Sequence, residues 1–277
     1  MERSCAALSL LQLIGIGIRT GCAIMKRIIL SGCSGRMGHF ITQTVSQRSD
    51  CVIVAGFDIA SAMKENFPVL SDPQQFDGNA DVIIDFSHPS FLTKLLSFAK
   101  TRKIPAVIST TGMSPSQIEE IHAAAQEIPI FFSANMSLGV NLLLDLAKKA
   151  AAVLSDSFDI EIIEMHHNQK VDAPSGTALM LANGISSVLD QKPDYVYDRH
   201  AERKKRTKNE IGLHSVRGGT IAGEHEIIFA GNDEIIRLSH SATSKQIFAT
   251  GSVNAALFLA EKGPGFYDMS DLVASIK

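Results

Sequence analysis

The sequence predicts an α/β protein: a Rossmann-type doubly wound parallel sheet, plus a second α+β domain with a mixed open sheet. Three observations support this fold class. Short apolar strands alternate with helical patterns through the first half of the chain. A glycine-rich turn, Gly32 to Gly38, joins the first strand to the first helix. The second half is dominated by longer β-type segments.

The composition indicates a globular protein and argues against several classes of partner. The 277 residues, 45% of them hydrophobic, suffice for one large domain or two modest ones. A formal net charge of −3 argues against a whole-protein electrostatic footprint for nucleic acid or for an anionic membrane. The four cysteines lack metal-type spacing. They favour a reducing, cytoplasmic location over a disulfide scaffold.

The N-terminal segment does not match this profile. The apolar run Ala6 to Ile18 is too short to cross a membrane, which takes about 20 residues. The nucleotide-binding pattern begins directly after Met25. We therefore expect residues 1–24 to lie upstream of the true start, with a targeting or interaction segment as the alternative.

The glycine-rich turn predicts a pyrophosphate site. It follows the strand Arg27 to Ser31 and precedes a helical pattern. Glycines at 32, 35 and 38 permit a tight turn, close approach of backbone N–H groups to phosphate, and packing of the helix on the sheet. Ser34 stands where the second glycine of the usual pattern would be. A glycine triplet alone does not identify a nucleotide site.

Asp58 supports the nucleotide interpretation. It follows the second strand, Cys51 to Phe57, where an acidic residue accepts hydrogen bonds from the adenosine ribose hydroxyls. The alternative is an ordinary solvated loop Asp. Ile59 comes next, and the first basic residue after it is Lys64. Since no guanidinium is placed to meet a 2′-phosphate, the sequence favours NADH over NADPH.

The alternation continues through three more strands, Asp81 to Phe86, Ala106 to Ser109 and Pro129 to Phe132, and through a helix from Ser90 to Lys100. A further helix should begin at Ser114, which with Gln117 forms a capping-box pattern. Ligands of open α/β sheets bind outside the carboxyl ends of the strands, so the strand tips should share one crevice. These tips are Gly32, Asp58, Ser87, Ser109 to Gly112, and Ser133 to Met136.

The second half carries two adjacent histidines and a lysine. A helix from Leu138 to Leu154 leads to the strand Asp159 to His167. If that strand runs to His167, then His166 and His167 point to opposite faces, and one could face the cofactor. Lys170 would supply a fixed positive charge or a proton donor.

Three interpretations of these residues remain open: an exposed surface pair, a metal site, or a catalytic pair. A metal is disfavoured because H-E-x-x-H is absent and adjacent strand residues diverge. The segment Pro174 to Thr177 favours catalysis, because it opens an apolar helix whose free N–H groups can bind a carboxylate or phosphate. The sequence thus indicates a pocket for an acidic substrate.

These motifs resemble those of the dihydrodipicolinate reductase family. The most specific is Glu-x-His-His-x-x-Lys-x-Asp-Ala-Pro-Ser-Gly-Thr-Ala, which runs from Glu164 to Ala178. Gly-x-x-Gly-Arg-Met-Gly, Thr-Thr-Gly, Arg217-Gly218-Gly219 and Gly223-Glu224-His225 accompany it, so the resemblance covers nearly everything after Met25. It implies a homotetrameric enzyme without a metal. Such an enzyme uses NADH or NADPH to reduce a cyclic dicarboxylate to tetrahydrodipicolinate, in the diaminopimelate and lysine pathway.

The resemblance also implies residue roles. His166 is the implied proton donor or acceptor, and Lys170 the proton donor. The implied substrate ligands are His167, Lys170, Ser175, Gly176 and Thr177. The implied nucleotide ligands are Gly32, Cys33, Ser34, Gly35, Arg36, Met37, Asp58, Ser109, Thr110, Thr111, Ser133, Ala134, Asn135 and Met136. Ser109, Met136 and Lys245 depart from the family's usual glycine, aromatic and Arg, which puts cofactor preference and affinity in question.

We expect a discontinuous nucleotide domain, residues 25–137 and 245–277, interrupted by a substrate-binding and oligomerisation domain, residues 138–244. Hinges near Ser137 and Lys245 would allow closure over substrate. In the second domain, the strand Asp159 to His167 should form one sheet with three later segments: Ile211 to Val216, Glu224 to Ala230 and Glu234 to Ser241.

Three alternatives remain from the residues. The basic segment Gln191 to Glu210 could be a nucleic-acid patch, although a solvated or interface loop is favoured in a net-acidic protein. The whole chain could be a nucleotide-binding sensor that has lost catalysis, or a dehydrogenase of another small acid. The intact His166 and Lys170 pair argues against the sensor.

Overall fold

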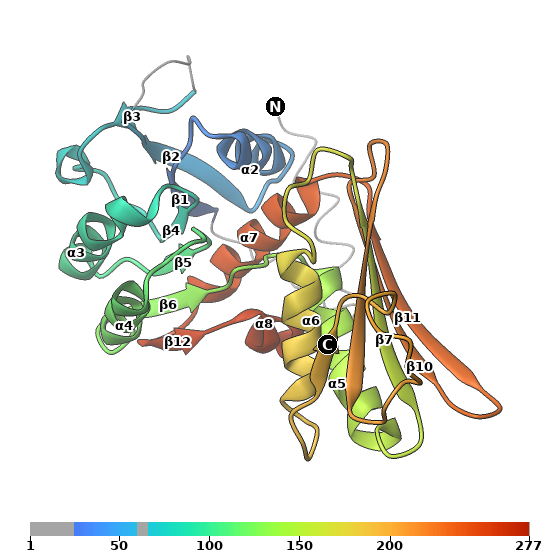
Figure 1. The fold of residues 1–277 in the computed structure, drawn as a ribbon. Coiled ribbons are helices and arrows are strands. Elements are labelled where there is room, and N and C mark those ends of the chain that lie inside the picture. Colours follow the sequence, from blue (N-terminus) through green and yellow to red (C-terminus); the bar gives the residue numbers. More distant parts are fainter. Residues whose placement is uncertain (1–24, 60–65, 277) are drawn as a thin grey trace, which may run out of the picture.

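The computed structural model describes residues 25–59 and 66–276, which fold into two lobes (Figure 1). The expected N-terminal extension, residues 1–24, lies outside the described residues, as does Lys64. Of the cysteines, Cys33 and Cys51 are buried, whereas Cys5 and Cys22 also lie outside that part of the chain.

The first lobe is built on a seven-stranded sheet in which every pairing is parallel. Its order is β12-β6-β5-β4-β1-β2-β3. The strands are β1 (Lys26–Ser31), β2 (Cys51–Phe57), β3 (Val69–Leu70), β4 (Val82–Asp85), β5 (Ala106–Ile108), β6 (Pro129–Phe132) and β12 (Gly265–Tyr267). The predicted doubly wound parallel sheet is confirmed.

Helices cover both faces of this sheet. On one face lie α2 (Arg36–Ser46), α7 (Gln246–Leu259) and α8 (Met269–Ser275), and on the other α3 (Leu92–Arg102) and α4 (Pro115–Ala124). Strand residues alternate between the two faces, so Ile28 and Leu30 join one core while Ile29 joins the other. All three are fully buried, which explains the unbroken apolar strands of the sequence.

Helix starts follow local sequence signals. The predicted capping box is confirmed: Ser114 Oγ accepts a hydrogen bond from Gln117 N at 3.3 Å, and Gln117 Oε1 accepts one from Ser114 N at 2.9 Å. The helix expected from Ser90 begins instead at Leu92, because a 3₁₀ turn, Pro89–Phe91, precedes it. Another 3₁₀ turn, Pro73–Gln75, follows β3.

The second lobe contains a five-stranded mixed sheet, as expected, in the order β11-β10-β7-β9-β8. Its strands are β7 (Asp159–His166), β8 (Asp194–Val196), β9 (Glu210–Arg217), β10 (Gly223–Ala230) and β11 (Ile235–Ala242). The pairs β7–β9 and β8–β9 are parallel, whereas β10 runs antiparallel to both of its neighbours. Two helices, α5 (Leu138–Leu154) and α6 (Gly176–Ser186), pack on one face.

The chain returns to the first lobe at its C-terminal end. α7 packs against α2, and β12 pairs with β6 at the edge of the first sheet (Figure 1). Ser137 and Lys245, the N-cap residues of α5 and α7, mark the two crossings between the lobes. The domain boundaries and the hinges at these crossings stay predictions.

Candidate active site

The glycine-rich turn adopts a conformation that only glycine accommodates at two positions. Gly32 has φ +78°, and a Cβ there would lie 2.5 Å from the carbonyl oxygen of Phe86. At Gly38 a Cβ would lie 2.2 Å from the carbonyl oxygen of Cys33. The turn therefore packs closely on the backbone that follows β4 and on the start of α2. Its other side borders a cavity, where a ligand can approach the backbone.

Asp58 joins this turn directly. Its Oδ2 accepts a hydrogen bond from the backbone N–H of Ser34 at 3.0 Å. Both residues line a cavity of about 660 Å³, which we call the turn cavity. Its lining residues are Gly32, Ser34, Gly35, Phe57, Asp58, Ile59, Phe86, Ser87, His88, Ser90 and Phe91. Among the lining residues that the structure describes there is neither Lys nor Arg.

A second hollow, the threonine cavity, lies at the ends of β5 and β6. Its lining residues are Met37, Phe86, Ser87, Ser109, Thr110, Thr111, Ala134, Met136, Lys245 and Phe248. Because Phe86 and Ser87 line both cavities, the two adjoin. The strand tips predicted to share a crevice thus lie along adjoining cavities.

Asp85 fixes two of these strand tips, and sequence reasoning gave it no role. It is 1% exposed, and burial raises the pKa of its carboxyl. It accepts hydrogen bonds from Ser87 Oγ and Thr110 Oγ1, each at 2.6 Å. The sequence does contain a signal for this role, because Asp85 is an acidic residue at the end of an otherwise apolar strand.

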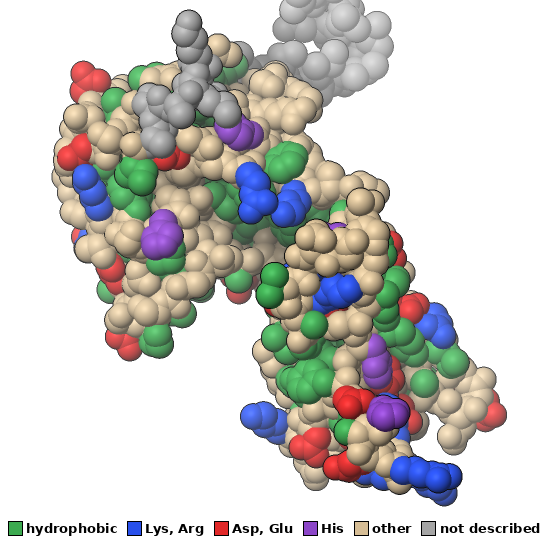
Figure 2. Space-filling view, turned by 45° about the horizontal axis from the view of Figure 1, so that its top comes forward, with side chains coloured by type: hydrophobic (Ala, Val, Ile, Leu, Met, Phe, Trp, Pro, Cys, Tyr) green, Lys and Arg blue, Asp and Glu red, His purple; other side chains and the backbone are tan. Residues whose placement is uncertain are grey.

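A third cavity, of about 420 Å³, brings together all the predicted catalytic and substrate-binding residues, and we call it the histidine cavity. These residues are His166, His167, Lys170, Ser175, Gly176 and Thr177. Four residues of the threonine cavity also line it: Thr111, Ala134, Lys245 and Phe248. In the space-filling view the two lobes are joined through a narrower middle, with the surface hollowed between them (Figure 2).

The condition under which the two histidines would point to opposite faces, a strand that runs to His167, is not met. Strand β7 ends at His166, and the chain turns at Asn168, so the alternation of strand side chains does not extend to His167. Both imidazoles therefore line the same cavity rather than opposite faces of a sheet. The Nδ1 of His167 is buried and has no hydrogen-bond partner within the described residues.

His166 contacts Glu164, which is fully buried. His166 Nδ1 lies 2.6 Å from Glu164 Oε2, and Arg217 donates to both carboxylate oxygens, each at 2.7 Å. Burial alone would raise the pKa of the Glu164 carboxyl, but these hydrogen bonds from Arg217 and His166 outweigh it and lower the pKa to about 2. The carboxyl is therefore ionised at neutral pH.

Lys170 and Ser175 also line the histidine cavity. Lys170 Nζ lies 2.8 Å from Asp172 Oδ1, and the hydrogen bond from Lys170 lowers the pKa of the Asp172 carboxyl. Ser175 caps α6, where its Oγ accepts from Ala178 N at 3.1 Å, and it lies 3.0 Å from His225 Nε2. Burial lowers the pKa of His225 to about 4, so its ring is neutral at pH 7.

Asn135 connects the two halves of the site. Its side-chain N–H donates to Thr177 Oγ1 at 3.0 Å, and its Oδ1 accepts from Ser137 N at 3.0 Å. Three other predicted nucleotide ligands line none of the three cavities. Arg36 is exposed at the start of α2, Ser133 donates to Asn135 O, and Cys33 faces the core. Cys33 could therefore contact a nucleotide only through its backbone.

Four residues of the site have no role in the sequence-based prediction: Glu164, Arg217, His225 and His240. Glu164 could have been found from the alternation along β7, which places it on the same side as the buried Ile160 and Ile162. The other three depend on pairings with distant parts of the chain.

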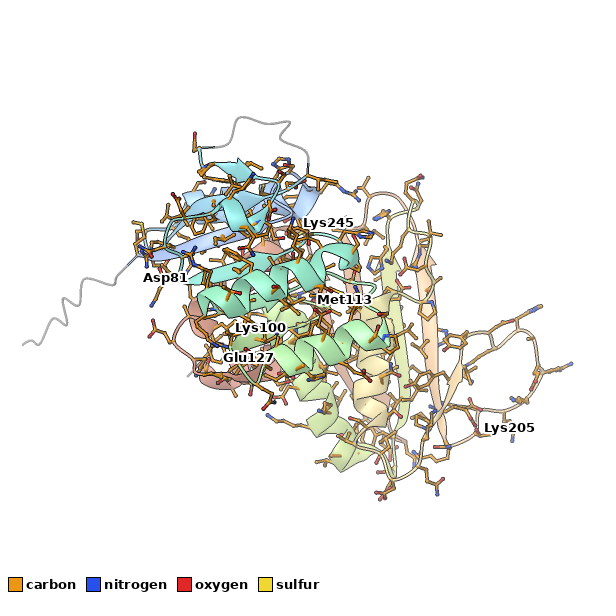
Figure 3. All side chains as sticks on the ribbon, turned by 90° about the vertical axis from the view of Figure 1, so that its left-hand side faces the viewer. Asp81, Lys100, Met113, Glu127, Lys205 and Lys245 are labelled. Atoms are coloured by element: carbon orange, nitrogen blue, oxygen red, sulfur yellow. The ribbon has the colours of Figure 1, made fainter. Side chains whose placement is uncertain are left out.

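The basic segment between β8 and β9 is engaged with acidic side chains. Arg199 pairs with Glu161 and Glu210, and Arg206 pairs with Glu161. Lys205 lies at the outer end of the second lobe, far from Lys245 (Figure 3). The pairing favours the loop interpretation over the nucleic-acid patch.

The described residues hold neither a candidate metal site nor a candidate membrane-spanning helix. Residues 25–59 and 66–276 hold no group of three His, Cys, Asp or Glu side chains placed to bind a metal ion. In the same part of the chain, no helix is long and apolar enough to cross a bilayer.

Comparison with known proteins gives consistent matches. Two family models match the chain, "Dihydrodipicolinate reductase, N-terminus" over residues 26–136 and "Dihydrodipicolinate reductase, C-terminus" over residues 139–273. The 4-hydroxy-tetrahydrodipicolinate reductase of Caldanaerobacter subterraneus subsp. tengcongensis is 50% identical, over 90% of this chain and 99% of that protein. That of Clostridium novyi is 47% identical, over 91% and 99%.

Solved structures of similar fold agree with these sequence matches. Dipicolinate-bound dihydrodipicolinate reductase from Paenisporosarcina sp. TG-14 superposes with a TM-score of 0.75 at 25% identity, covering 88% of this chain and 98% of that one. The diaminopimelate dehydrogenase of C. glutamicum, at 14% identity and a TM-score of 0.54 over 92% and 97%, shares the fold.

Proposed function

The chain belongs to the dihydrodipicolinate reductase family, and from that premise we propose which residues perform the family's reaction. Its activity is that of a 4-hydroxy-tetrahydrodipicolinate reductase, an NAD(P)H-dependent oxidoreductase of diaminopimelate and lysine biosynthesis. One observation carries the assignment of roles. The histidine cavity and the threonine cavity share four lining residues, so a substrate in one would meet a nicotinamide in the other.

We assign the two substrate carboxylates to Lys170 and to the start of α6. The Ser175-Gly176-Thr177 segment presents the first N–H groups of that helix to the histidine cavity, and an anion there is favoured by the helix dipole. Lys170 is 21% exposed and pairs with an Asp172 that is 57% exposed, so a substrate carboxylate can replace this solvated partner. His167, with its unpartnered Nδ1, is the third ligand.

The proton comes from His166 or Lys170 in this proposal. Bound NAD(P)H supplies a hydride to an electron-poor carbon of the ring. Because Glu164 is ionised and can only accept, Nδ1 of His166 carries a proton and Nε2 is left for the ligand. A protonated Nε2 or the Lys170 ammonium can then deliver the proton that balances the hydride, while the 4-hydroxyl of the substrate leaves as water.

The residues at the turn cavity fit a dinucleotide. Backbone occupies the space that a Cβ would need at Gly32 and Gly38, which is how such turns approach a pyrophosphate closely. Gly32 to Met37, Ser109 to Thr111 and Ser133 to Met136 would hold the cofactor. We propose a preference for NADH, because the turn cavity presents the Asp58 carboxylate and, within the described residues, no Lys or Arg to a 2′-phosphate.

We further propose a cytoplasmic homotetramer. The support for assembly is the face of the second sheet opposite α5 and α6. Val216 and Ile235 lie on this uncovered face and are 44% and 57% exposed, and Ile228 lies between them on β10.

A coupled assay tests the function. The aldol product of pyruvate and aspartate semialdehyde is supplied, and the absorbance of the reduced nicotinamide is followed. We expect loss of absorbance with NADH and slower loss with NADPH. Absence of any loss with both cofactors would overturn the assignment.

A further inference from the structure

One buried carboxylate touches three separate parts of the site. Glu164 has no exposed surface, and its oxygens accept from His166 Nδ1, from the backbone N–H of Ser175 and from both terminal nitrogens of Arg217. The bond from Ser175 N measures 3.1 Å and ties Glu164 to the start of α6. Glu164 thus contacts both the proposed proton-transfer residue, His166, and the proposed anion-binding start of α6.

Arg217 extends this network to the lysine. Its Nη2 donates to the backbone oxygen of Asp172 at 2.6 Å, and the side chain of Asp172 pairs with Lys170. Arg217 belongs to β9 and Glu164 to β7, two neighbouring parallel strands of the second sheet. The loop that carries Lys170 is therefore tied to the core of the sheet through Arg217.

Stability alone is a poor explanation for this pair. Burying the Glu164 carboxylate costs desolvation that its attraction to the partly exposed Arg217 repays only in part, and apolar replacements of buried pairs are often neutral. The pair also orients neighbouring residues of the site. It fixes the tautomer of His166, since an ionised carboxylate requires a proton on Nδ1, and it fixes the orientation of the ring.

We propose that Glu164 and Arg217 form a positioning pair, which aims Nε2 of His166 and the loop of Lys170 into the histidine cavity. This inference rests on the roles proposed above for His166 and Lys170. Neither Glu164 nor Arg217 need touch the substrate, so both act through other residues.

Other charged and titratable groups face His166. The ring of His225, on β10, lies 5.3 Å from that of His166, centroid to centroid, in an edge arrangement. Lys170, His167, His240 and Lys245 line the same cavity. Among these neighbours and its own hydrogen-bond partners, Glu164 alone brings a negative charge to the ring, whereas Asp172 is paired with Lys170. Glu164→Gln would therefore remove the negative charge that contacts the His166 ring.

The first test is Glu164→Gln, which keeps the shape of the side chain and removes its charge. We expect kcat to fall by about 100-fold or more, the contribution typical of a positioned proton donor, while the dissociation constant for NADH stays unchanged. The pH at which kcat/KM is half lost on the alkaline side should move about one unit or more towards acid. A merely structural role would lower stability without moving this midpoint.

Glu210→Gln is the matched control. Glu210 is also a buried glutamate of the second sheet, and hydrogen bonds from Thr207 and then Arg199 lower its pKa to about 2. It lines none of the three cavities. We expect Glu210→Gln to keep the wild-type kcat and the wild-type pH midpoint, even if it lowers stability.

Two further variants keep the test decisive if Glu164→Gln fails to fold. The double variant Glu164→Gln with Arg217→Met removes both charges of the pair, and we expect a folded protein with low kcat and a midpoint still shifted towards acid. Arg217→Lys keeps the charge but loses the two-pronged contact, so we expect lower kcat with an unshifted midpoint. Wild-type kcat in the double variant would overturn the proposal. Absence of reductase activity in the wild type would instead overturn the proposed function.

Discussion

The substitution Asp58→Asn should shift the cofactor preference of the enzyme towards NADPH. Asp58 Oδ2 lies 3.0 Å from Ser34 N, and an Asn in the same position keeps an acceptor oxygen for that N–H. Only the negative charge is removed. The change therefore probes the electrostatics of the turn cavity with little effect on the conformation of the turn.

The size of the effect follows from Coulomb's law. A 2′-phosphate carries a charge of about −1.5 to −2. Two unit charges about 4 Å apart repel by about 1 kcal/mol in water and about 4 kcal/mol at an effective dielectric constant of 20. Asp58 is only partly buried, so the lower value applies, which gives about 1.5 to 2 kcal/mol. Discrimination against NADPH should thus fall by about 10- to 30-fold.

The assay is the ratio of kcat/KM for NADPH to that for NADH, measured from initial rates at low and at high salt. Because the repulsion is screened by ions, the wild-type ratio should rise with salt, whereas that of Asp58→Asn should change little. Asp77→Asn, at an exposed Asp that lines none of the cavities, is the control. A ratio that rises in Asp58→Asn by less than about 2-fold, or as much in the control, would refute the electrostatic reasoning.

Three further predictions concern packing, pH and assembly. Gly38→Ala should lower the free energy of unfolding by about 1 to 3 kcal/mol and weaken NADH binding, because the added Cβ would overlap the carbonyl oxygen of Cys33. Urea denaturation measures the stability and a fluorescence titration measures the binding. Wild-type values in both experiments would contradict this prediction. The pKa of Glu210 is lower in the folded state than its ordinary value of 4.5, so the unfolded chain binds more protons and stability should fall as the pH drops from about 4.5 towards 2. Glu210→Gln should flatten that slope in denaturation curves recorded at several pH values, and an unchanged slope would count against the ion pair. Ile235→Asp should dissociate the proposed tetramer in light scattering, whereas retention of the wild-type mass would place the interface elsewhere.

Local signals in the sequence were sufficient for much of the fold. The helix Leu138–Leu154 and the strand Pro129–Phe132 have the predicted bounds, and the Ser114 cap has the predicted partners. In each case the residues that decide the element lie within a few positions of one another. Apolar periodicity and cap chemistry act over that distance.

Three of the short strands were not predictable in the same way. β3, β8 and β12 have two or three residues each and form only by pairing with strands elsewhere in the chain, such as β12 with β6. The end of β7 at His166 was missed for a related reason. Nothing in the His-His dipeptide itself shows where the pairing with β9 stops, and that point decides which way His167 faces.

In the site, too, contacts within a short segment were predictable and contacts between distant segments were not. The grouping of His166, Lys170 and Ser175 was predictable because one short segment carries all three residues. The contacts of Glu164 with Arg217 and of Ser175 with His225 join residues that are distant in sequence and meet only in the folded sheet. Their chemistry follows from tertiary structure, so a single sequence could suggest that Glu164 faces inward but could not name its partner.

Lys170→Ala tests the central claim, that the histidine cavity performs the proton transfer and binds the substrate while the nucleotide binds next to it. The measurement is kcat together with the dissociation constant for NADH, with Lys149→Ala, at an exposed lysine of α5, as control. The account predicts that kcat falls by about 100-fold or more while NADH binding and the control remain as in the wild type. A near-normal kcat in Lys170→Ala would contradict it.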